Sequence, residues 1–239
     1  MRSAMTACVV CAVLVMGMMS GSDGAVRADE EPEAAAEAPA RTPLRAGMIG
    51  LTTSHVPAFA GLLNDPNAEG VLADVRVTAA VPAGMPDNPS GWSRREKYTE
   101  DMRNLGATIY DTVEEMLPEV DVVMVMSVDG RPHLEYAKKA IEAGKPVYID
   151  KPMAASLADV LEIFRLAEEH KVPVFSASSL RYSSGFQQMR NDPPVGKVLG
   201  CEAFSPCAIE EHHPDLFWYG VHGVETLFTI MGPGCESVS

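Results

Sequence analysis

Cysteines and positive charges are scarce in this chain of 239 residues, and each shortage excludes a class of protein. Two of the five cysteines lie in the first apolar run, and the other three are too few for a disulfide framework. We expect those three to be free thiols, with a single bridge as the alternative. The chain has 19 Lys and Arg against 33 Asp and Glu, a net charge of −14, so we predict no nucleic-acid partner and no binding to anionic membranes.

Long apolar runs are also rare, and the clearest one lies at the start of the chain. Residues 4–19 are apolar and uncharged, Arg2 precedes them, and small residues follow up to position 28. This pattern is typical of a secretory signal peptide, and the run is shorter than the about 20 residues of a membrane span. We therefore predict an exported protein, periplasmic or extracellular, with a signal peptide at 1–28 and no stable membrane span. An uncleaved anchor is the alternative.

Residues 29–43 are rich in Ala, Glu and Pro and predict a disordered acidic linker. From residue 44 onward, short apolar strands alternate with amphipathic helices, and the run 121–128 is apolar enough for a strand covered on both faces. This order predicts βαβ units in a doubly wound parallel sheet of the Rossmann type. The predicted strands are 46–50, 75–81, 107–110, 121–128, 147–150 and 172–176, and the predicted helices are 54–64, 93–104, 112–117, 132–143 and 156–170.

The last part of the chain predicts a second unit. Helices are expected at 184–191 and 219–231, and a strand at 197–204. We place the Rossmann dinucleotide-binding domain at 44–152 and the beginning of an α+β substrate domain at 153–239.

The first predicted strand leads into a loop that matches a dinucleotide fingerprint only in part. A Rossmann loop needs a glycine for the turn, a second for approach to the pyrophosphate and a third for helix packing. Here Gly50 matches, whereas Thr52 and His55 replace the second and third glycines. The helix start still offers amide groups and hydroxyls to a phosphate. We predict cofactor contacts from Gly50, Thr52, Thr53 and Ser54.

The second strand lacks the carboxylate that would bind a ribose, since residues 81–84 read Val-Pro-Ala-Gly. Arg94 and Arg95 follow in the next helix. They predict either a contact with the extra phosphate of NADP or a solvated helix face.

A short motif, Asp150-Lys151-Pro152, ends the strand at 147–150, at the edge where open α/β sheets bind ligands. Further on, a helix carries Gly220 and His222. This order, from residue 44 to the end, resembles the Gfo/Idh/MocA family of nicotinamide-dependent sugar oxidoreductases. Most of that family's second-domain sheet would come later, so we expect a truncated member or a fragment.

The resemblance implies roles for individual residues. Lys151 would lie near the nicotinamide and stabilise the alkoxide that develops on the substrate, with His222 as general acid and base. Ser127, His133 and Asp150 would line the cofactor. The alternative for His133 is a helix-start histidine whose ring is bound by backbone groups.

Three further residues are predicted to contact the substrate. Arg181 lies in a polar-x-Arg-aromatic phrase, and Glu225 stands at the last acid of the family's catalytic helix. Trp218 replaces the first acid and could stack on a sugar ring. The histidines and acids between 212 and 225 match no zinc spacing, so we predict no metal site.

The resemblance therefore implies an enzyme that uses NAD or NADP on a hydroxyl of a small carbohydrate or cyclitol. Two alternatives stay open. One is a carbohydrate-binding protein on the same scaffold without catalysis, and the other is a redox-neutral glycoside-processing enzyme that retains NAD. Self-association into a homo-oligomer is compatible with either.

Overall fold

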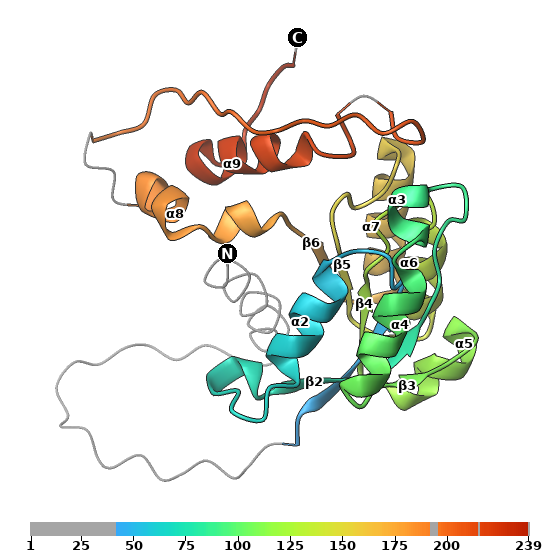
Figure 1. The fold of residues 1–239 in the computed structure, drawn as a ribbon. Helices are drawn as coiled ribbons and strands as arrows, with labels where there is room; N and C mark the ends of the chain where they lie inside the picture. The colour runs from blue at the N-terminus through green and yellow to red at the C-terminus, as the bar shows by residue number, and fades with distance from the viewer. Residues whose placement is uncertain (1–41, 192–195, 215, 239) are drawn as a thin grey trace, which may run out of the picture.

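A six-stranded parallel sheet forms the centre of the protein (Figure 1). The structure is a computed structural model that describes residues 42–191, 196–214 and 216–238. The strand order is β3-β2-β1-β4-β5-β6, the Rossmann order, and every paired neighbour is parallel. The strands are β1 (Leu44–Ile49), β2 (Val75–Val81), β3 (Thr108–Ile109), β4 (Val122–Val125), β5 (Val147–Ile149) and β6 (Val174–Ser176). The predicted fold class is confirmed.

Helices cover both faces of this sheet. One face packs on α2 (His55–Leu63) and α4 (Arg95–Asn104), the other on α5 (Val113–Met116), α6 (His133–Glu142) and α7 (Leu157–His170). Alternate residues of β4 belong to the two apolar cores, because successive side chains of a strand point to opposite faces. All four β4 residues are buried, as the apolar run predicted. The shorter helical segments here are η1 (Gly70–Leu72), α3 (Pro89–Trp92) and η2 (Leu117–Glu119).

The helix starts follow their sequence signals. Thr112 and Glu115 form a reciprocal capping box at α5, and the Ser156 hydroxyl accepts a hydrogen bond from the Asp159 amide at the start of α7. These contacts satisfy amide groups that the first helical turn leaves free.

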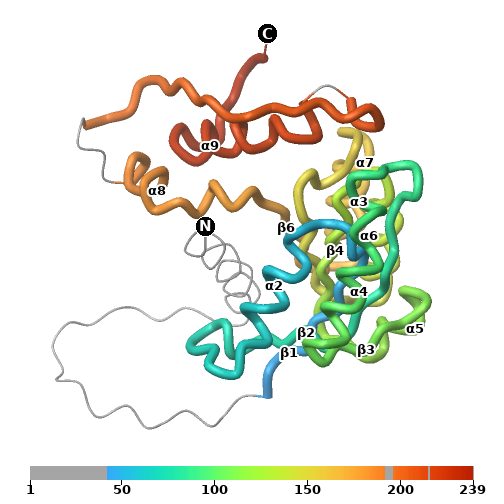
Figure 2. The backbone as a smooth tube through the Cα atoms, viewed as in Figure 1, coloured from blue at the N-terminus to red at the C-terminus, as the bar shows by residue number. Residues whose placement is uncertain are grey.

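The sheet continues past the predicted domain boundary at residue 152. β6 pairs with β5, so α7 and β6 belong to the Rossmann sheet. The helical segments after β6 are η3 (Ser179–Tyr182), α8 (Ser184–Asn191) and α9 (Val221–Met231). They contact one another beside the end of β6 (Figure 2). The Rossmann sheet therefore extends to residue 176.

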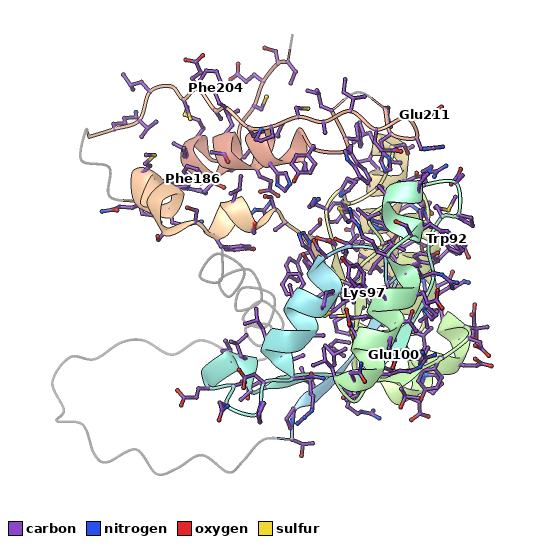
Figure 3. All side chains as sticks on the ribbon, viewed as in Figure 1. Trp92, Lys97, Glu100, Phe186, Phe204 and Glu211 are labelled. Carbon is purple, nitrogen blue, oxygen red and sulfur yellow. The ribbon has the colours of Figure 1, made fainter. Side chains whose placement is uncertain are left out.

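The predicted strand at 197–204 is wrong. Those residues form irregular chain, and no strand follows β6 within the part that the structure describes. Leu199 is 84% exposed and Phe204 is 88% exposed. Figure 3 shows the Phe204 side chain on this irregular segment. An apolar segment forms a strand only where a neighbour pairs with its backbone, and no described segment does so here.

Two predicted segments cannot be compared with the structure. The signal peptide at 1–28 and all but the end of the linker at 29–43 lie outside the described residues. In the ranges that are described, we find no helix with the length and apolarity needed to span a lipid bilayer.

The sheet has its topological switch point between β1 and β4, and Gly50 lies in the loop there. Its φ is +89°, and a Cβ at this position would lie 2.7 Å from the Ser127 backbone nitrogen. Only glycine tolerates both the left-handed backbone and this close approach of the two loops.

Replacing Gly50 with alanine is expected to destabilise the fold by about 2 kcal/mol or more, because strain and a backbone clash combine. Urea unfolding measures the change. Gly61→Ala is the matched control, since nothing lies within 4 Å of its Cβ position in α2. That control is expected to be neutral or slightly stabilising. Equal stability of the two variants would contradict the prediction.

Candidate functional site

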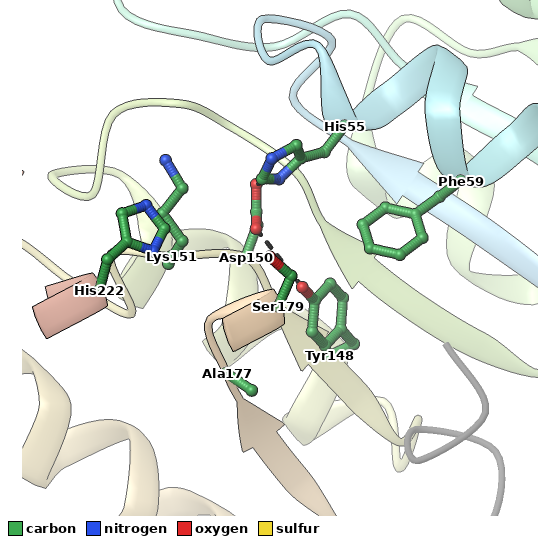
Figure 4. A pocket seen from close by; sticks show the side chains of 8 residues that line it. All are labelled: His55, Phe59, Tyr148, Asp150, Lys151, Ala177, Ser179 and His222. Carbon is green, nitrogen blue, oxygen red and sulfur yellow. Dashed lines mark hydrogen bonds and ion pairs between the residues drawn. The ribbon is translucent and has the colours of Figure 1, made fainter. Parts of the chain in front are cut away.

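A small pocket opens at the carboxyl ends of β5 and β6 (Figure 4). Side chains from α2, from β5 and its following loop, and from the segment after β6 meet α9 there. Crevices of this kind are where open parallel sheets bind ligands. The lining residues are His55, Phe59, Tyr148, Asp150, Lys151, Ala177, Ser179 and His222.

Asp150 is the most buried charged group of this pocket, with 1% of its surface exposed. Its Oδ2 lies 2.8 Å from His55 Nδ1, and Tyr148 donates a long hydrogen bond to Oδ1 at 3.4 Å. Burial raises the pKa of Asp150, but the nearby His55 and Lys151 outweigh it and hold that pKa below its usual value. Asp150 is therefore a carboxylate at neutral pH.

Lys151 follows Asp150 and faces the same pocket. Its ammonium lies 5.0 Å from the centre of the Tyr219 ring, a cation–π contact. Burial lowers the pKa of Lys151, and the Asp150 carboxylate opposes this shift. A partly desolvated cation at the end of a strand suits the stabilisation of negative charge on a bound oxygen.

His222 is the second residue of α9 and lines the pocket from the first turn of that helix. Its Nδ1 lies 2.7 Å from the hydroxyl of Ser178, which is fully buried, and the Tyr219 ring packs edge-on against it at 4.8 Å. Burial, followed by repulsion from Lys151 and His55, lowers the pKa of His222 to about 4. The ring is therefore neutral at pH 7.

The predicted substrate contacts Arg181 and Glu225 bind each other. Arg181 donates two hydrogen bonds of 2.7 Å to the Glu225 carboxylate, which also accepts from the Ser178 amide at 3.3 Å. Neither residue lines the pocket. This ion pair fixes α9 against the end of β6 and so positions His222 through Ser178.

Trp218 also lies elsewhere than predicted. Its ring packs on His213 at 4.8 Å and does not line the pocket with Lys151 and His222. His213 is itself buried and accepts a hydrogen bond from the Gly130 amide. The prediction that Trp218 stacks on a sugar ring is not supported by this position.

The residues predicted to hold the cofactor are mostly buried and bound to their own chain. The Thr52 hydroxyl accepts from the Val128 amide at 2.9 Å, Thr53 accepts from the His55 amide, and Ser127 accepts from the Asp129 amide. Only Ser54 among the four loop residues is exposed. His133 is fully buried, and its two ring nitrogens face the carbonyls of Met153 and Ser127. This matches the alternative in which backbone groups bind the ring.

Helix α3 covers the second glycine position. A Cβ on Gly91 would lie 3.2 Å from Thr52 Cβ and 2.5 Å from Val128 Cγ1, so the backbone of α3 rests directly on the loops after β1 and β4. Polar contacts of the two residues before α3 hold this helix in place. Asn88 donates to buried Asp129, and Arg131 bridges Asp129 to Asp87.

Arg94 and Arg95 were predicted either to contact the extra phosphate of NADP or to form a solvated helix face. The contacts of Arg95 with α3 bear on this choice. The Arg95 guanidinium lies 4.3 Å from the centre of the Trp92 ring and donates to the Pro82 carbonyl. Arg94 is exposed. Arg95 is thus engaged in holding α3 to the end of β2.

Sequence reasoning missed three residues of the site. His55 was treated as a departure from the glycine fingerprint, and Ser178 and Tyr219 were not singled out. The available signal was the position of His55 at the start of a helix that faces the Asp150-Lys151 motif across the carboxyl edge of the sheet. The contacts of Ser178 and Tyr219 depend on the docking of α9, which no local pattern predicts.

Comparison with known proteins places these features in a family. A family profile described as "Oxidoreductase family, NAD-binding Rossmann fold", GFO_IDH_MocA, matches residues 90–178. The chain is 28% identical over 155 residues to the uncharacterized oxidoreductase YhhX of Escherichia coli, covering 58% of this chain and 44% of that protein. Residues 90–178 therefore match the Gfo/Idh/MocA oxidoreductase family, and the similarity to YhhX agrees with this match. This confirms the predicted family and, at the level of the family, the nicotinamide dinucleotide class of cofactor.

Two further proteins are similar to this chain. An inositol 2-dehydrogenase of Gluconacetobacter diazotrophicus is 37% identical over 100 residues, covering 39% of this chain and 29% of that enzyme. A putative NADPH-dependent oxidoreductase of Desulfitobacterium hafniense has the same fold, with a TM-score of 0.62 at 20% identity over 81% of this chain and 56% of that one. The chain spans less than half the length of these curated relatives.

The lowered pKa of His222 predicts a pH dependence of stability. The usual pKa of a histidine is 6.5, and the pKa of His222 in the folded protein is about 4. Between these pH values, His222 is protonated in the unfolded chain and neutral in the folded protein. This part of the stability is complete above pH 6.5 and is lost as the pH falls towards 4.

In urea unfolding from pH 7 to pH 4.5, His222→Gln is expected to show a shallower loss of stability than the unmodified protein. His212→Gln is the control, because a hydrogen bond to Glu210 raises the pKa of His212 and its removal should act in the opposite direction. A pH dependence left unchanged by His222→Gln would contradict the prediction.

Proposed function

We propose that this chain supports NAD(P)-dependent oxidation or reduction at a hydroxyl-bearing carbon of a small carbohydrate or cyclitol. The observation that carries the proposal is the placement of Lys151 at the end of β5, in one pocket with His55 and His222. The family assignment supports the reaction class. The similarity to an inositol 2-dehydrogenase supports a polyol substrate.

The chemistry required of the protein is the control of one proton and one developing charge. As a substrate hydroxyl becomes a carbonyl, its oxygen loses a proton and passes through alkoxide character. Lys151 can hold that oxygen with a charge-assisted hydrogen bond, which is strong because the ammonium is partly removed from water. The histidines on α2 and α9 provide the proton-transfer and orienting groups.

The residues present fit a nicotinamide cofactor at its reactive end. The pocket at β5 combines the Lys151 cation with the imidazoles of His55 and His222, and Gly50 gives the tight turn that the fingerprint needs at β1. When bound, the cofactor supplies or accepts the hydride. Its pyrophosphate would lie by the loop at 50–55, where Thr52 is 2% exposed beneath α3. Binding there therefore requires α3 to move away from Thr52.

Weakening the attachment of α3 is expected to improve cofactor binding. Asp87→Ala removes the contacts of this exposed residue with Arg131 and leaves the buried Asp129 paired. A surface pair of this kind contributes up to about 1 kcal/mol, so the open fraction and the apparent affinity for NAD(P) should rise up to about fivefold.

Isothermal titration with NAD and NADP measures that change. Asp101→Ala, which removes the exposed ion pair with Lys97 in α4, is the control and should leave affinity unchanged. Equal affinity of the unmodified protein and Asp87→Ala would show that α3 does not limit binding.

Loss of the Lys151 ammonium is expected to abolish most of the activity. Lys151→Met keeps much of the side-chain volume and should lower kcat by about 100- to 1,000-fold, the cost of losing one donor to a developing oxyanion. Formation of reduced cofactor with a panel of cyclitols and sugars measures turnover. Lys138→Met, an exposed lysine paired with Glu142 in α6, is the control. Full turnover by Lys151→Met would contradict the proposed function.

A second candidate function is favoured by the covered Thr52 loop. A carbohydrate-binding protein that has lost cofactor chemistry would have no need for an accessible pyrophosphate position. Calorimetric binding of a sugar without cofactor, together with no binding of NAD or NADP by the unmodified protein or Asp87→Ala, would support this candidate over the oxidoreductase.

A further inference from the structure

The two histidines of the pocket are held by partners of different chemistry. His55 faces a carboxylate, and His222 faces a serine hydroxyl. A neutral imidazole has one nitrogen that donates and one that accepts, and the partner of the first nitrogen decides the role of the second. The two rings therefore present different nitrogens to a substrate.

His55 is held as a proton acceptor. An ionised carboxylate only accepts hydrogen bonds, so the Asp150 Oδ2 at 2.8 Å accepts a hydrogen bond from Nδ1–H of His55. In the neutral ring this leaves the lone pair on Nε2. The imidazole is 31% exposed whereas the carboxylate beneath it is 2% exposed, so the ring is the part of this pair that a ligand can reach.

His222 is held as a hydrogen-bond donor. The Ser178 oxygen already accepts from the Leu180 amide at 3.2 Å. Ser178 is fully buried, so its hydroxyl proton needs an acceptor, and His222 Nδ1 lies 2.7 Å away. With Nδ1 accepting, the proton of the neutral ring is on Nε2. A neutral imidazole in this form cannot take a further proton through the exposed nitrogen.

We propose that His55 is the proton acceptor for the substrate hydroxyl through Nε2, with Asp150 as its positioning residue, and that His222 donates a hydrogen bond to the substrate. The inference rests on the proposed oxidation of a hydroxyl. The substrate O–H bond breaks as an N–H bond forms on His55, and the C–H bond breaks with its electron pair passing as hydride to the oxidised nicotinamide dinucleotide. Lys151 stabilises the oxygen until the carbonyl forms.

This role depends on the departure from the glycine fingerprint. A glycine at position 55 would have no side chain, so it could neither bind Asp150 nor reach the pocket. His55 thus places a side chain that can exchange protons at the carboxyl edge of β5, at a position where the fingerprint has a glycine for close packing.

The tautomers can be measured without turnover. Long-range ¹H–¹⁵N correlation spectra of the full chain are expected to show a protonated Nδ1 on His55 and a protonated Nε2 on His222. Asp150→Asn should alter the His55 pattern and leave His222 unchanged. A protonated Nε2 on neutral His55, or a protonated Nδ1 on neutral His222, would overturn the proposal.

Kinetics test the catalytic step. His55→Gly is expected to lower kcat/KM by about 100-fold. Added imidazole should raise the kcat/KM of this variant about tenfold, because the free base can occupy the vacated space. His55→Gln, which keeps side-chain bulk, should be equally slow and should not be rescued. His222→Gln should weaken turnover but keep the acidic limb of the pH–rate profile, which His55→Gly should remove.

Different results would contradict the role of His55 and the proposed oxidation. Normal turnover by His55→Gly with an unchanged pH profile would overturn the role of His55 while the oxidation itself stands. If Lys151→Met and His55→Gly are as active as the unmodified protein, both the role and the proposed function fail.

Discussion

The site is organised around one buried charge, the carboxylate of Asp150. A carboxylate that is 1% exposed is costly unless positive or hydrogen-bonding partners compensate it. The compensation comes from His55 on α2 and from Lys151, the next residue along the chain. The acid thereby connects α2 to the end of β5. Removing it would leave His55 without its hydrogen-bond partner and Lys151 without the adjacent negative charge.

The same arrangement explains why the glycine loop could depart from its fingerprint. Thr52 and His55 occupy positions that a bound pyrophosphate and close helix packing leave to glycine, yet each side chain has a defined partner here. Thr52 binds the Val128 amide beneath α3, and His55 binds Asp150. The Thr52 and His55 side chains are thus bound within the protein, and a cofactor must compete with these internal contacts in order to bind.

The sequence predicted the sheet well because its signals are local and periodic. The apolar run of β4, the caps of α5 and α7, and the Asp150-Lys151-Pro152 motif each depend on neighbouring residues, and the structure places them as expected. The side-chain contacts of the site were harder to predict. Arg181 and Glu225 each suit a sugar, and nothing within either segment shows that α9 docks so as to pair them.

The strand expected at 197–204 is absent because it has no pairing partner among the described residues, and the proton-transfer role of His222, which stays a prediction, depends on a distant partner in a similar way. An apolar segment becomes a strand only through a partner, and a histidine becomes a base or a donor only through the group bound to its other nitrogen. For His222 that group is Ser178, 44 residues earlier, held in turn by Glu225. The chemistry of the pocket is therefore decided by where α9 contacts the end of β6, so a change in that contact would alter proton transfer without touching Lys151 or Asp150.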